Sequence, residues 1–447
     1  MSPPETSGEE PDPLDAFRQF VALEGDVFVL SLALFAFSLG FQMTGRYMPR
    51  YLDVLGASAV AIGLYGSVGN LISAVYPYPG GALSDRIGSR LSLTLFGAAS
   101  TAGFVVWYGA GTVADVVVGP VNLAVVAVFL GLALSQAWKS FGLGATFAVV
   151  KQSTSPSRLA EGFAGTETFR RTAFLVGPLL AAAAVARTQF RVGFRLVLLV
   201  AAGFGLLATV AQHVLYDAGD DSVGDSFAGV ASVVDDLRSL PDPLGPLLVA
   251  DTLVRFGNGM VYVFFVIVVT DRLGVGAALP VVGRLGPEAY FGVLLAVEMA
   301  VALLSMVPVA RLARSVGLKP VVAAGFSVYA VFPALLVSAP ADQWVLAALF
   351  AFSGLRFAGL PAHKALIVGP AERDAGGRVT GAYYLLRNVV VVPSAAVGGW
   401  LYGLDRVVVG TVAVDGPTLA FGVATVVGLL GTGYFLRRGE EFAAYAD

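Results

Sequence analysis

Cysteine is absent from the 447 residues of this sequence, and histidine occurs only at His213 and His363. The lack of cysteine excludes disulfides, thiolate metal sites and cysteine nucleophiles. Two histidines so far apart also exclude the paired-histidine zinc motif of metalloproteases. We find no glycine-rich phosphate loop and no nucleophile elbow. These absences predict that the protein is not an enzyme and that it uses neither a cofactor nor a metal.

Charge is scarce as well, because 13% of the residues are charged, about half the share in soluble proteins. Hydrophobic residues make up 57% and form long runs, many close to the ~20 residues that span a bilayer as a helix. The sequence therefore predicts an all-α membrane protein. Its twelve expected transmembrane helices cover residues 27–48, 59–79, 91–111, 122–149, 160–185, 194–215, 244–270, 288–309, 320–338, 344–368, 379–402 and 417–436.

The polar segments divide the chain into a tail, two halves, a loop and a second tail. The expected parts are a tail at 1–26, a six-helix half at 27–215, a loop at 216–243, a second half at 244–436 and a tail at 437–447. The first tail is acidic and rich in proline, unlike a signal peptide. Lysine and arginine near the span ends number about 13 on the side of the termini and about 7 on the other side. This bias places both termini in the cytoplasm of a cell whose plasma membrane holds the protein.

Internal repetition supports the division into two halves. Three pairs of segments match with offsets between 216 and 218 residues: AWKSFG at 137–142 with GLRFAG at 354–359, GTETFRR at 165–171 with GAYYLLR at 381–387, and YLDVLG at 51–56 with VTDRLG at 269–274. Two six-helix halves in parallel orientation explain this pattern. The halves are therefore expected to be pseudo-symmetric.

The loop at 81–90, GALSDRIGSR, resembles the signature of the major facilitator superfamily of secondary transporters. The matching residues are Gly81, Asp85, Arg86, Gly88 and Arg90. The resemblance implies the twelve-helix fold of that family, transport by alternating access, and a latch in which Asp85 holds the two halves together. The second copy, ARLARSVGLK at 310–319, keeps Gly317 and Lys319 but has Arg314 where the aspartate would stand. The latch is therefore expected to be stronger in the first half.

Basic residues inside the expected helices are the main candidates for a substrate site. A lone cation at mid-membrane costs about 2.5–3.5 kcal/mol, so each must face water, a counter-ion or a ligand. Lys139 and Arg356 occupy matching places in the two halves and are expected to face each other across a central cavity. Side chains three or four residues apart share a helix face. The candidate substrate-binding residues are Lys139, Arg356, Arg387, Arg171, Gln136, Arg46 and Tyr383.

Basic residues outnumber acidic ones inside these spans. Asp251 is expected to pair with Arg255, and Glu167 with Arg170 or Arg171, so structural ion pairs are as plausible as ligand contact for several of these arginines. Glu298 is then the remaining carboxylate. A cavity with surplus positive charge attracts anions, which predicts a small organic anion as substrate. Glu298 and Glu167 are the candidate proton carriers, because burial disfavours a charged carboxylate.

The sequence thus predicts a monomeric secondary transporter that moves a small solute, together with protons, by symport or antiport. No nucleic acid is expected as a partner. Two alternatives stay open. Gly177–Pro178 and the aromatic residues Trp138 and Tyr262 are compatible with an efflux antiporter for drugs and other amphipathic compounds. A transporter-like receptor or scaffold that moves nothing is the other.

Overall fold

A computed structural model describes residues 25–76, 83, 86–114, 116–119, 121–139, 159–216, 240–280, 283–370, 376–409 and 412–441. Of residues 25–27, 121, 159–170, 376–378, 409 and 412 it describes the backbone alone. Within these ranges, eight helices are long and apolar enough to cross a membrane, and a bent pair forms a ninth span. Three shorter apolar helices, Ala59–Val75, Leu123–Ala137 and Arg171–Val185, correspond to the other expected spans.

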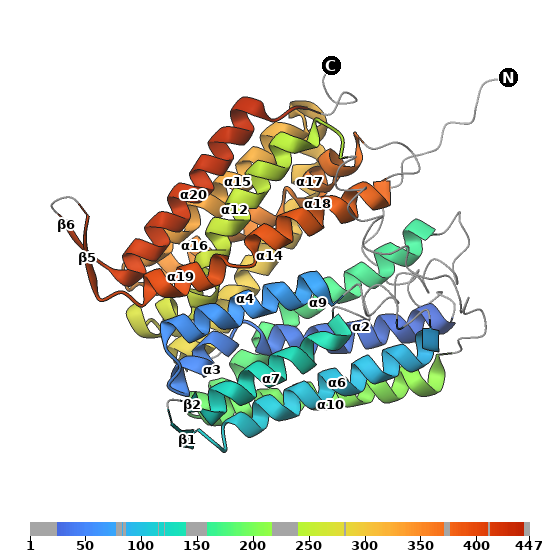
Figure 1. Cartoon of the computed structure of the whole chain (residues 1–447), viewed down its shortest axis with the longest axis vertical. Helices are drawn as coiled ribbons and strands as arrows, with labels where there is room; N and C mark the ends of the chain where they lie inside the picture. Colours follow the sequence, from blue (N-terminus) through green and yellow to red (C-terminus); the bar gives the residue numbers. More distant parts are fainter. Residues whose placement is uncertain are drawn as a thin grey trace.

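The first half is a bundle of helices drawn in blue to green in Figure 1. Its helices are α2 (Gly25–Thr44), α3 (Met48–Val54), α4 (Ala59–Val75), α6 (Ser89–Ala110), α7 (Leu123–Ala137), α9 (Leu159–Val185) and α10 (Phe190–Leu215). The axes of α2 and α3 differ by 41°, so the first span is bent and reaches six residues beyond its expected end at 48.

The second half forms the other bundle, yellow-green to red in Figure 1. Its first span contains α12 (Leu244–Val261), the 3₁₀ turn η2 (Tyr262–Phe264), α13 (Phe265–Ile267) and the π-helical η3 (Val268–Arg272). The rest comprises α14 (Pro287–Val316), α15 (Leu318–Val337), α16 (Gln343–Gly354), η4 (Leu355–Phe357), α17 (Leu360–Val368), α18 (Gly376–Val391), α19 (Ser394–Tyr402) and α20 (Gly416–Arg438).

Three antiparallel β-hairpins, which the sequence did not predict, connect helices at one end of the molecule. They are β1 (Val117–Val118) with β2 (Val121–Asn122), β3 (Ala277–Leu279) with β4 (Gly283–Leu285), and β5 (Arg406–Val409) with β6 (Val412–Asp415). The first and third mark this end in Figure 1. We call it the hairpin end.

Short polar side chains begin four helices at the hairpin end. Ser58, Asn122, Asp342 and Asp415 each accept a hydrogen bond from a backbone N–H in the first turn of α4, α7, α16 and α20. Such caps satisfy donors that the helix leaves unpaired. Desolvation raises the pKa of Asp415, but hydrogen bonds from Thr418 and Arg272 outweigh it and lower this pKa to about 2.

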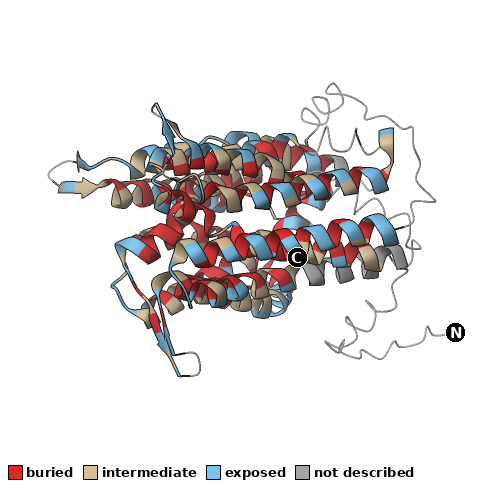
Figure 2. Ribbon diagram, turned by 90° about the horizontal axis from the view of Figure 1, so that it is seen from below, coloured by how far each residue is buried: buried red, intermediate tan, exposed pale blue. Residues whose placement is uncertain are grey.

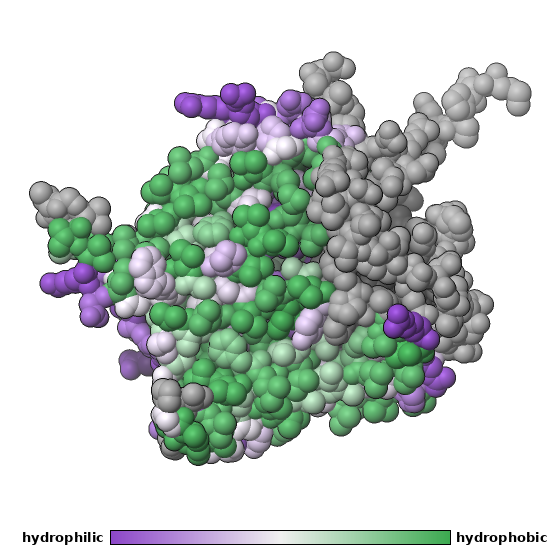
Figure 3. All heavy atoms as spheres, in the orientation of Figure 1, coloured by the Kyte–Doolittle hydropathy of each residue, from purple (hydrophilic) through white to green (hydrophobic). Residues whose placement is uncertain are grey.

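Small residues let the two halves approach closely near the hairpin end. A Cβ added to Gly63 on α4 would lie 2.8 Å from the Cα of Gly399 on α19, and the Ser67 hydroxyl accepts a bond from the Ala396 N–H at 2.9 Å. Buried residues lie between the helices, as Figure 2 shows. The face seen in Figure 3 is largely apolar. Exposed leucines, such as Leu304 at 77% and Leu207 at 69%, also contribute to the surface of the molecule. Such a surface suits a lipid environment, where small residues are the usual helix contacts.

Candidate functional site

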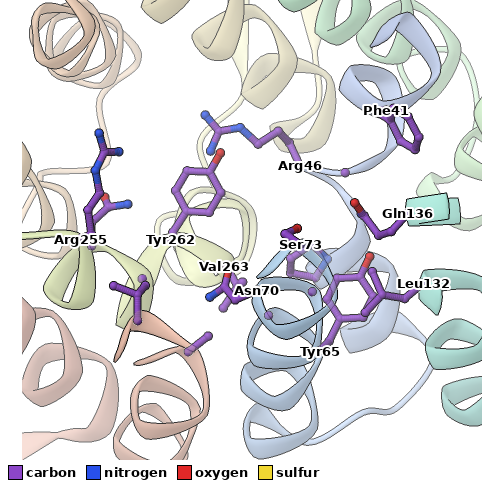
Figure 4. A pocket seen from close by; sticks show the side chains of 18 of the residues that line it. Phe41, Arg46, Tyr65, Asn70, Ser73, Leu132, Gln136, Arg255, Tyr262 and Val263 are labelled. Atoms are coloured by element: carbon purple, nitrogen blue, oxygen red, sulfur yellow. The ribbon is translucent and has the colours of Figure 1, made fainter. Parts of the chain in front are cut away.

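A cavity of about 450 Å³ lies between the halves, and its lining comes from both (Figure 4). Pockets that bind small molecules typically measure about 300–1,000 Å³. The first half contributes polar and aromatic residues, among them Gln42, Arg46, Tyr65, Asn70, Ser73, Gln136 and Lys139. The second half contributes Arg255, Asn258, Tyr262, Tyr329, Arg356, Arg387 and Asn388, among others.

Four of the spans lose regular α-helical geometry where they meet this cavity. Arg46 lies in the bend between α2 and α3, and Lys139 lies in a π-helical turn that follows α7. Tyr262 begins η2, and Arg356 is the middle residue of η4. Interrupted helices are tolerated at membrane depth where they are buried in protein or line a cavity, and they commonly form the binding sites of transporters. These four spans therefore mark the centre of the site.

Glu298 on α14 pairs with two arginines of the cavity lining, one from each half. It is 2% exposed, and its Oε2 accepts a hydrogen bond from Arg46 Nη2 of the first half at 3.0 Å. Its Oε1 accepts bonds from Arg356 Nη2 at 2.7 Å and from Ser353 Oγ at 2.5 Å. Hydrogen bonds between charged groups, such as those from the two arginines, are stronger than neutral ones. Arg46 and Arg356 were both expected to bind the substrate, and here both are paired with Glu298.

Arg356 is also surrounded by aromatic rings, although only part of its guanidinium group is paired. Its Cζ lies 4.7 Å from the ring centre of Phe357, 5.0 Å from Tyr329 and 5.7 Å from Phe332. Across the cavity, Arg46 stacks on Tyr262 at 4.2 Å. Aromatic faces favour a desolvated cation. They hold both guanidinium groups beside the cavity.

A second buried carboxylate, Asp251 on α12, organises the arginines of the second half. Its side chain is fully buried, and it pairs with Arg255 at 3.3 Å and with Arg387 at 3.0 Å. The Tyr383 hydroxyl donates to it at 3.2 Å, and His363 Nε2 lies 3.4 Å away. The expected Asp251–Arg255 pair is thus present. The candidate Tyr383 contacts Asp251 and is not among the lining residues.

The described lining of the cavity carries surplus positive charge. Its five cations are Arg46, Lys139, Arg255, Arg356 and Arg387. Among the described residues, the four arginines share the two carboxylates Glu298 and Asp251, so these arginines carry an excess of two positive charges. A cavity with such an excess attracts anions and repels cations.

Two further candidates, Arg171 and Glu167, are not among the described lining residues. Arg171 on α9 contacts the Met306 sulfur on α14 at 3.0 Å and does not line the described part of the cavity. The side chain of Glu167 lies outside the described residues. Sequence reasoning missed Asn70, Asn258 and Tyr329 as lining residues, although amides within apolar spans were a signal for the first two.

Ion pairs across the halves gather at the hairpin end. Arg50 on α3 pairs with Asp53 at 2.6 Å, with Asp271 of η3 at 2.5 Å and with Glu288 of α14 at 3.2 Å. Asp53 and Asp271 occupy matching positions of the internal repeat. We call these four residues the Arg50 cluster. It links the halves at the hairpin end.

The loops predicted to form the latch are described in part. Gly81 and Asp85 lie outside the described residues, whereas Arg86 is exposed and Arg90 Nε donates to the His213 carbonyl at 2.7 Å. Gly88 and its repeat partner Gly317 both have positive φ, 84° and 90°, and precede α6 and α15. Glycine adopts this conformation at little cost.

Glu441 places a carboxylate at the start of α15, beside the second loop that was predicted to form the latch. Its two oxygens accept bonds from the backbone N–H groups of Leu318 and Lys319 at 3.0 and 2.9 Å. An anion is favoured at a helix N-terminus. A Cβ at Gly317 would lie 2.5 Å from Glu441 Oε2. This glycine therefore makes room for the carboxylate.

Gly317→Ala is expected to lower the free energy of unfolding by roughly 1–2 kcal/mol, because alanine disfavours a positive φ, and to displace Glu441. Chemical unfolding of the purified protein in detergent measures this. Gly433→Ala in α20 is the matched control, since no atom lies within 4 Å of the added Cβ. Equal stability of the two variants would show that Gly317 is not under this constraint.

No family model and no curated protein matches the sequence. Solved structures do match over nearly the whole chain. A mutant of the nucleoside transporter NupG superposes with a TM-score of 0.70 at 12% identity, covering 92% of this chain and 100% of that one. The peptide transporter POT in complex with sulfate superposes with a TM-score of 0.67 at 14% identity, covering 95% of this chain and 99% of that one. A POT family transporter in complex with 5-aminolevulinic acid superposes with a TM-score of 0.66 at 13% identity, covering 94% of this chain and 100% of that one.

At such low identity the likeness shows the fold. The chain has the fold of these transporter structures, and a cavity lies between its two helical halves. The fold predicted from the sequence is confirmed, and the chain is a multi-pass membrane protein.

Proposed function

We propose that this protein is a secondary active transporter that carries a small organic anion across the cell membrane by alternating access. The observation that supports this most is the cavity between the halves, whose lining holds four arginines that share two buried carboxylates, Glu298 and Asp251. Arginine binds carboxylate and phosphate groups through parallel hydrogen bonds, so such a wall suits an anion. The protein works as a monomer with both termini in the cytoplasm, and no covalent chemistry occurs.

The contacts between the halves supply the moving parts of this mechanism. The Arg50 cluster closes the hairpin end, and Arg46–Glu298 lies between this cluster and the cavity. Opening of the cavity toward the hairpin end must separate Arg50 from Asp271 and Glu288, and Arg46 from Glu298. Interfaces of this kind switch between discrete arrangements. The ion pairs are therefore the contacts that alternate during transport.

Proton coupling runs through Glu298 in this proposal. Arg46 belongs to the first half, while Glu298 and Arg356 belong to the second, so separation of the halves leaves the carboxylate with one arginine in place of two. A carboxylate with fewer cations around it binds a proton more readily. A substrate anion that accepts a hydrogen bond from Arg356 in place of Glu298 would likewise favour proton binding by Glu298.

Uptake into proteoliposomes tests the function. Radiolabelled carboxylates are expected to enter, and unlabelled anions to compete, whereas cationic dyes and neutral sugars do not. Lys139→Met removes one lining charge and is expected to lower anion uptake about tenfold, the equivalent of one lost interaction of 1.4 kcal/mol. Lys364→Met, at an exposed position of α17, is the control. Efflux of dyes by both variants, or unchanged anion uptake by Lys139→Met, would contradict the proposal.

A further inference from the structure

The four arginines that line the cavity form two separate pairs, and each pair shares one buried carboxylate. The pairs are Arg46 with Arg356 at Glu298 of α14, and Arg255 with Arg387 at Asp251 of α12. Two guanidinium groups around one carboxylate carry one surplus positive charge, and His363 beside Asp251 adds charge only when it is protonated. Among the described residues, the lining therefore favours an anion at two places, one at each pair.

Each pair includes an arginine that a molecule in the cavity can reach. The side chain of Arg46 is 15% exposed in the first pair, whereas that of Arg356 is 1% exposed. In the second pair, Arg255 is 26% and Arg387 is 16% exposed. A guanidinium group has five N–H donors, so one that already binds a protein carboxylate can still donate to a second anion. The accessible groups are therefore Arg46 at one place and Arg255 with Arg387 at the other.

The two places lie within the reach of one small molecule. Arg255 and Arg356 stand over the same Tyr329 ring, 4.6 and 5.0 Å from its centre, so the two pairs are neighbours. Arg46 stacks on Tyr262, which follows Arg255 by seven residues on the same span, and Figure 4 shows Tyr262 between the two arginines. At a rise of ~1.5 Å per residue, the backbones of Arg255 and Tyr262 are about 10 Å apart along the span. Two anionic groups joined by a short carbon chain can reach both places, whereas a single anionic group reaches one.

We infer that the cargo is a short dicarboxylate, with one carboxylate at Arg46 and the other at Arg255 and Arg387. The inference rests on the proposed function and names its substrate class. A cargo of charge −2 matches the two surplus charges of the arginine pairs. The cavity of about 450 Å³ holds a four-carbon acid together with water, since each water occupies about 30 Å³. Arg46 belongs to the first half and the other two arginines to the second, so such a cargo contacts both halves.

Three anions that differ in the number and placement of their charges test the inference. Succinate and butyrate both have four carbons, but succinate has a carboxylate at each end and butyrate has one. Sulfate carries two charges on a single group. Binding to the purified full-length protein is measured by calorimetry at a pH at which both carboxyl groups of succinate are ionised. Succinate is expected to bind about 10- to 100-fold more tightly than either of the others, because its second carboxylate adds hydrogen bonds to charged groups.

Variants at the two ends locate the preference. Arg46→Gln and Arg255→Gln each remove the surplus charge of one pair, so each is expected to reduce the ratio of succinate to butyrate affinity about tenfold. Arg284→Gln in β4 is the matched control, because this arginine is exposed and is not among the lining residues. Arg255→Lys keeps the charge beside Asp251 and is expected to retain most of the preference, which separates loss of charge from loss of folding.

The outcomes distinguish the inference from the proposed function. Equal binding of succinate and butyrate by the unaltered protein, sulfate binding as tight as that of succinate, or an unchanged ratio in both glutamine variants would overturn the inference alone. Uptake of butyrate into proteoliposomes would then still support the proposed function. If no carboxylate binds or crosses the membrane, the proposed function fails as well.

Discussion

Glu298→Gln is expected to abolish proton-driven accumulation of substrate and to leave exchange of substrate across the membrane intact. Glutamine has nearly the same shape, and it still accepts hydrogen bonds from Ser353 and Arg356, but it cannot release a proton. A gradient of two pH units, at 1.36 kcal/mol each, drives about 100-fold accumulation when one proton accompanies each anion. The variant is expected to reach roughly equal concentrations on both sides.

The Glu298→Gln change is also expected to shift the balance between the states closed and open at the hairpin end, because Glu298 pairs with Arg46 of the other half. Charged Glu298 holds Arg46 across the halves at 3.0 Å and so favours the state closed at the hairpin end. Neutral glutamine gives up most of that attraction. Proton binding and opening toward the hairpin end therefore favour each other, and such coupling is reciprocal. The variant is expected to open toward the hairpin end more often than the unaltered protein.

Two measurements on proteoliposomes separate loss of coupling from loss of folding. Counterflow of labelled against unlabelled anion requires alternating access without a driving gradient, and the Glu298→Gln variant is expected to retain it. Uphill uptake under an imposed pH gradient is expected to disappear. Glu440→Gln, an exposed position after α20, should keep both activities. A Glu298→Gln variant that still concentrates the anion would show that another group carries the proton.

The sequence predicted the fold well because a bilayer leaves few choices. An apolar run of about 20 residues in lipid must satisfy its backbone groups as a helix, so the spans follow from hydrophobicity. The internal repeat then related Lys139 to Arg356, and the structure brings both to one cavity. Neither step needed knowledge of side-chain packing.

The partners of the buried charges were harder to predict because they come from distant parts of the chain. Glu298 meets Arg46 across 252 residues and Arg356 across 58, whereas the Asp251–Arg255 pair, four residues apart, was predictable from helix spacing. The break at Tyr262–Phe264 contains neither glycine nor proline, so nothing in its sequence marks it. Tertiary packing produces such a break, and it places Tyr262 beneath Arg46.

Asp251→Asn is expected to lower the free energy of unfolding by about 3–5 kcal/mol, the usual cost of removing one partner from a buried ion pair. The fully buried carboxylate pairs with Arg255 and Arg387, and His363 lies beside it. Asparagine keeps the volume and part of the hydrogen bonding, but it leaves two guanidinium groups without a counter-charge. Chemical unfolding in detergent micelles measures the loss. Asp405→Asn, at an exposed position, is expected to change little.

A double variant shows whether charge or packing causes that loss. Adding Arg387→Gln to Asp251→Asn removes one of the two arginines that have lost their counter-charge. The double variant is therefore expected to be more stable than Asp251→Asn alone, by about 1–3 kcal/mol. If packing around Asp251 were the cause, the second change would add its own cost. The measurement needs no substrate, so it stands apart from any transport assay. Asp251 also holds Arg255 and Arg387 beside the cavity. If the double variant regains stability but does not regain anion binding, Asp251 has a second role, which is to orient these arginines.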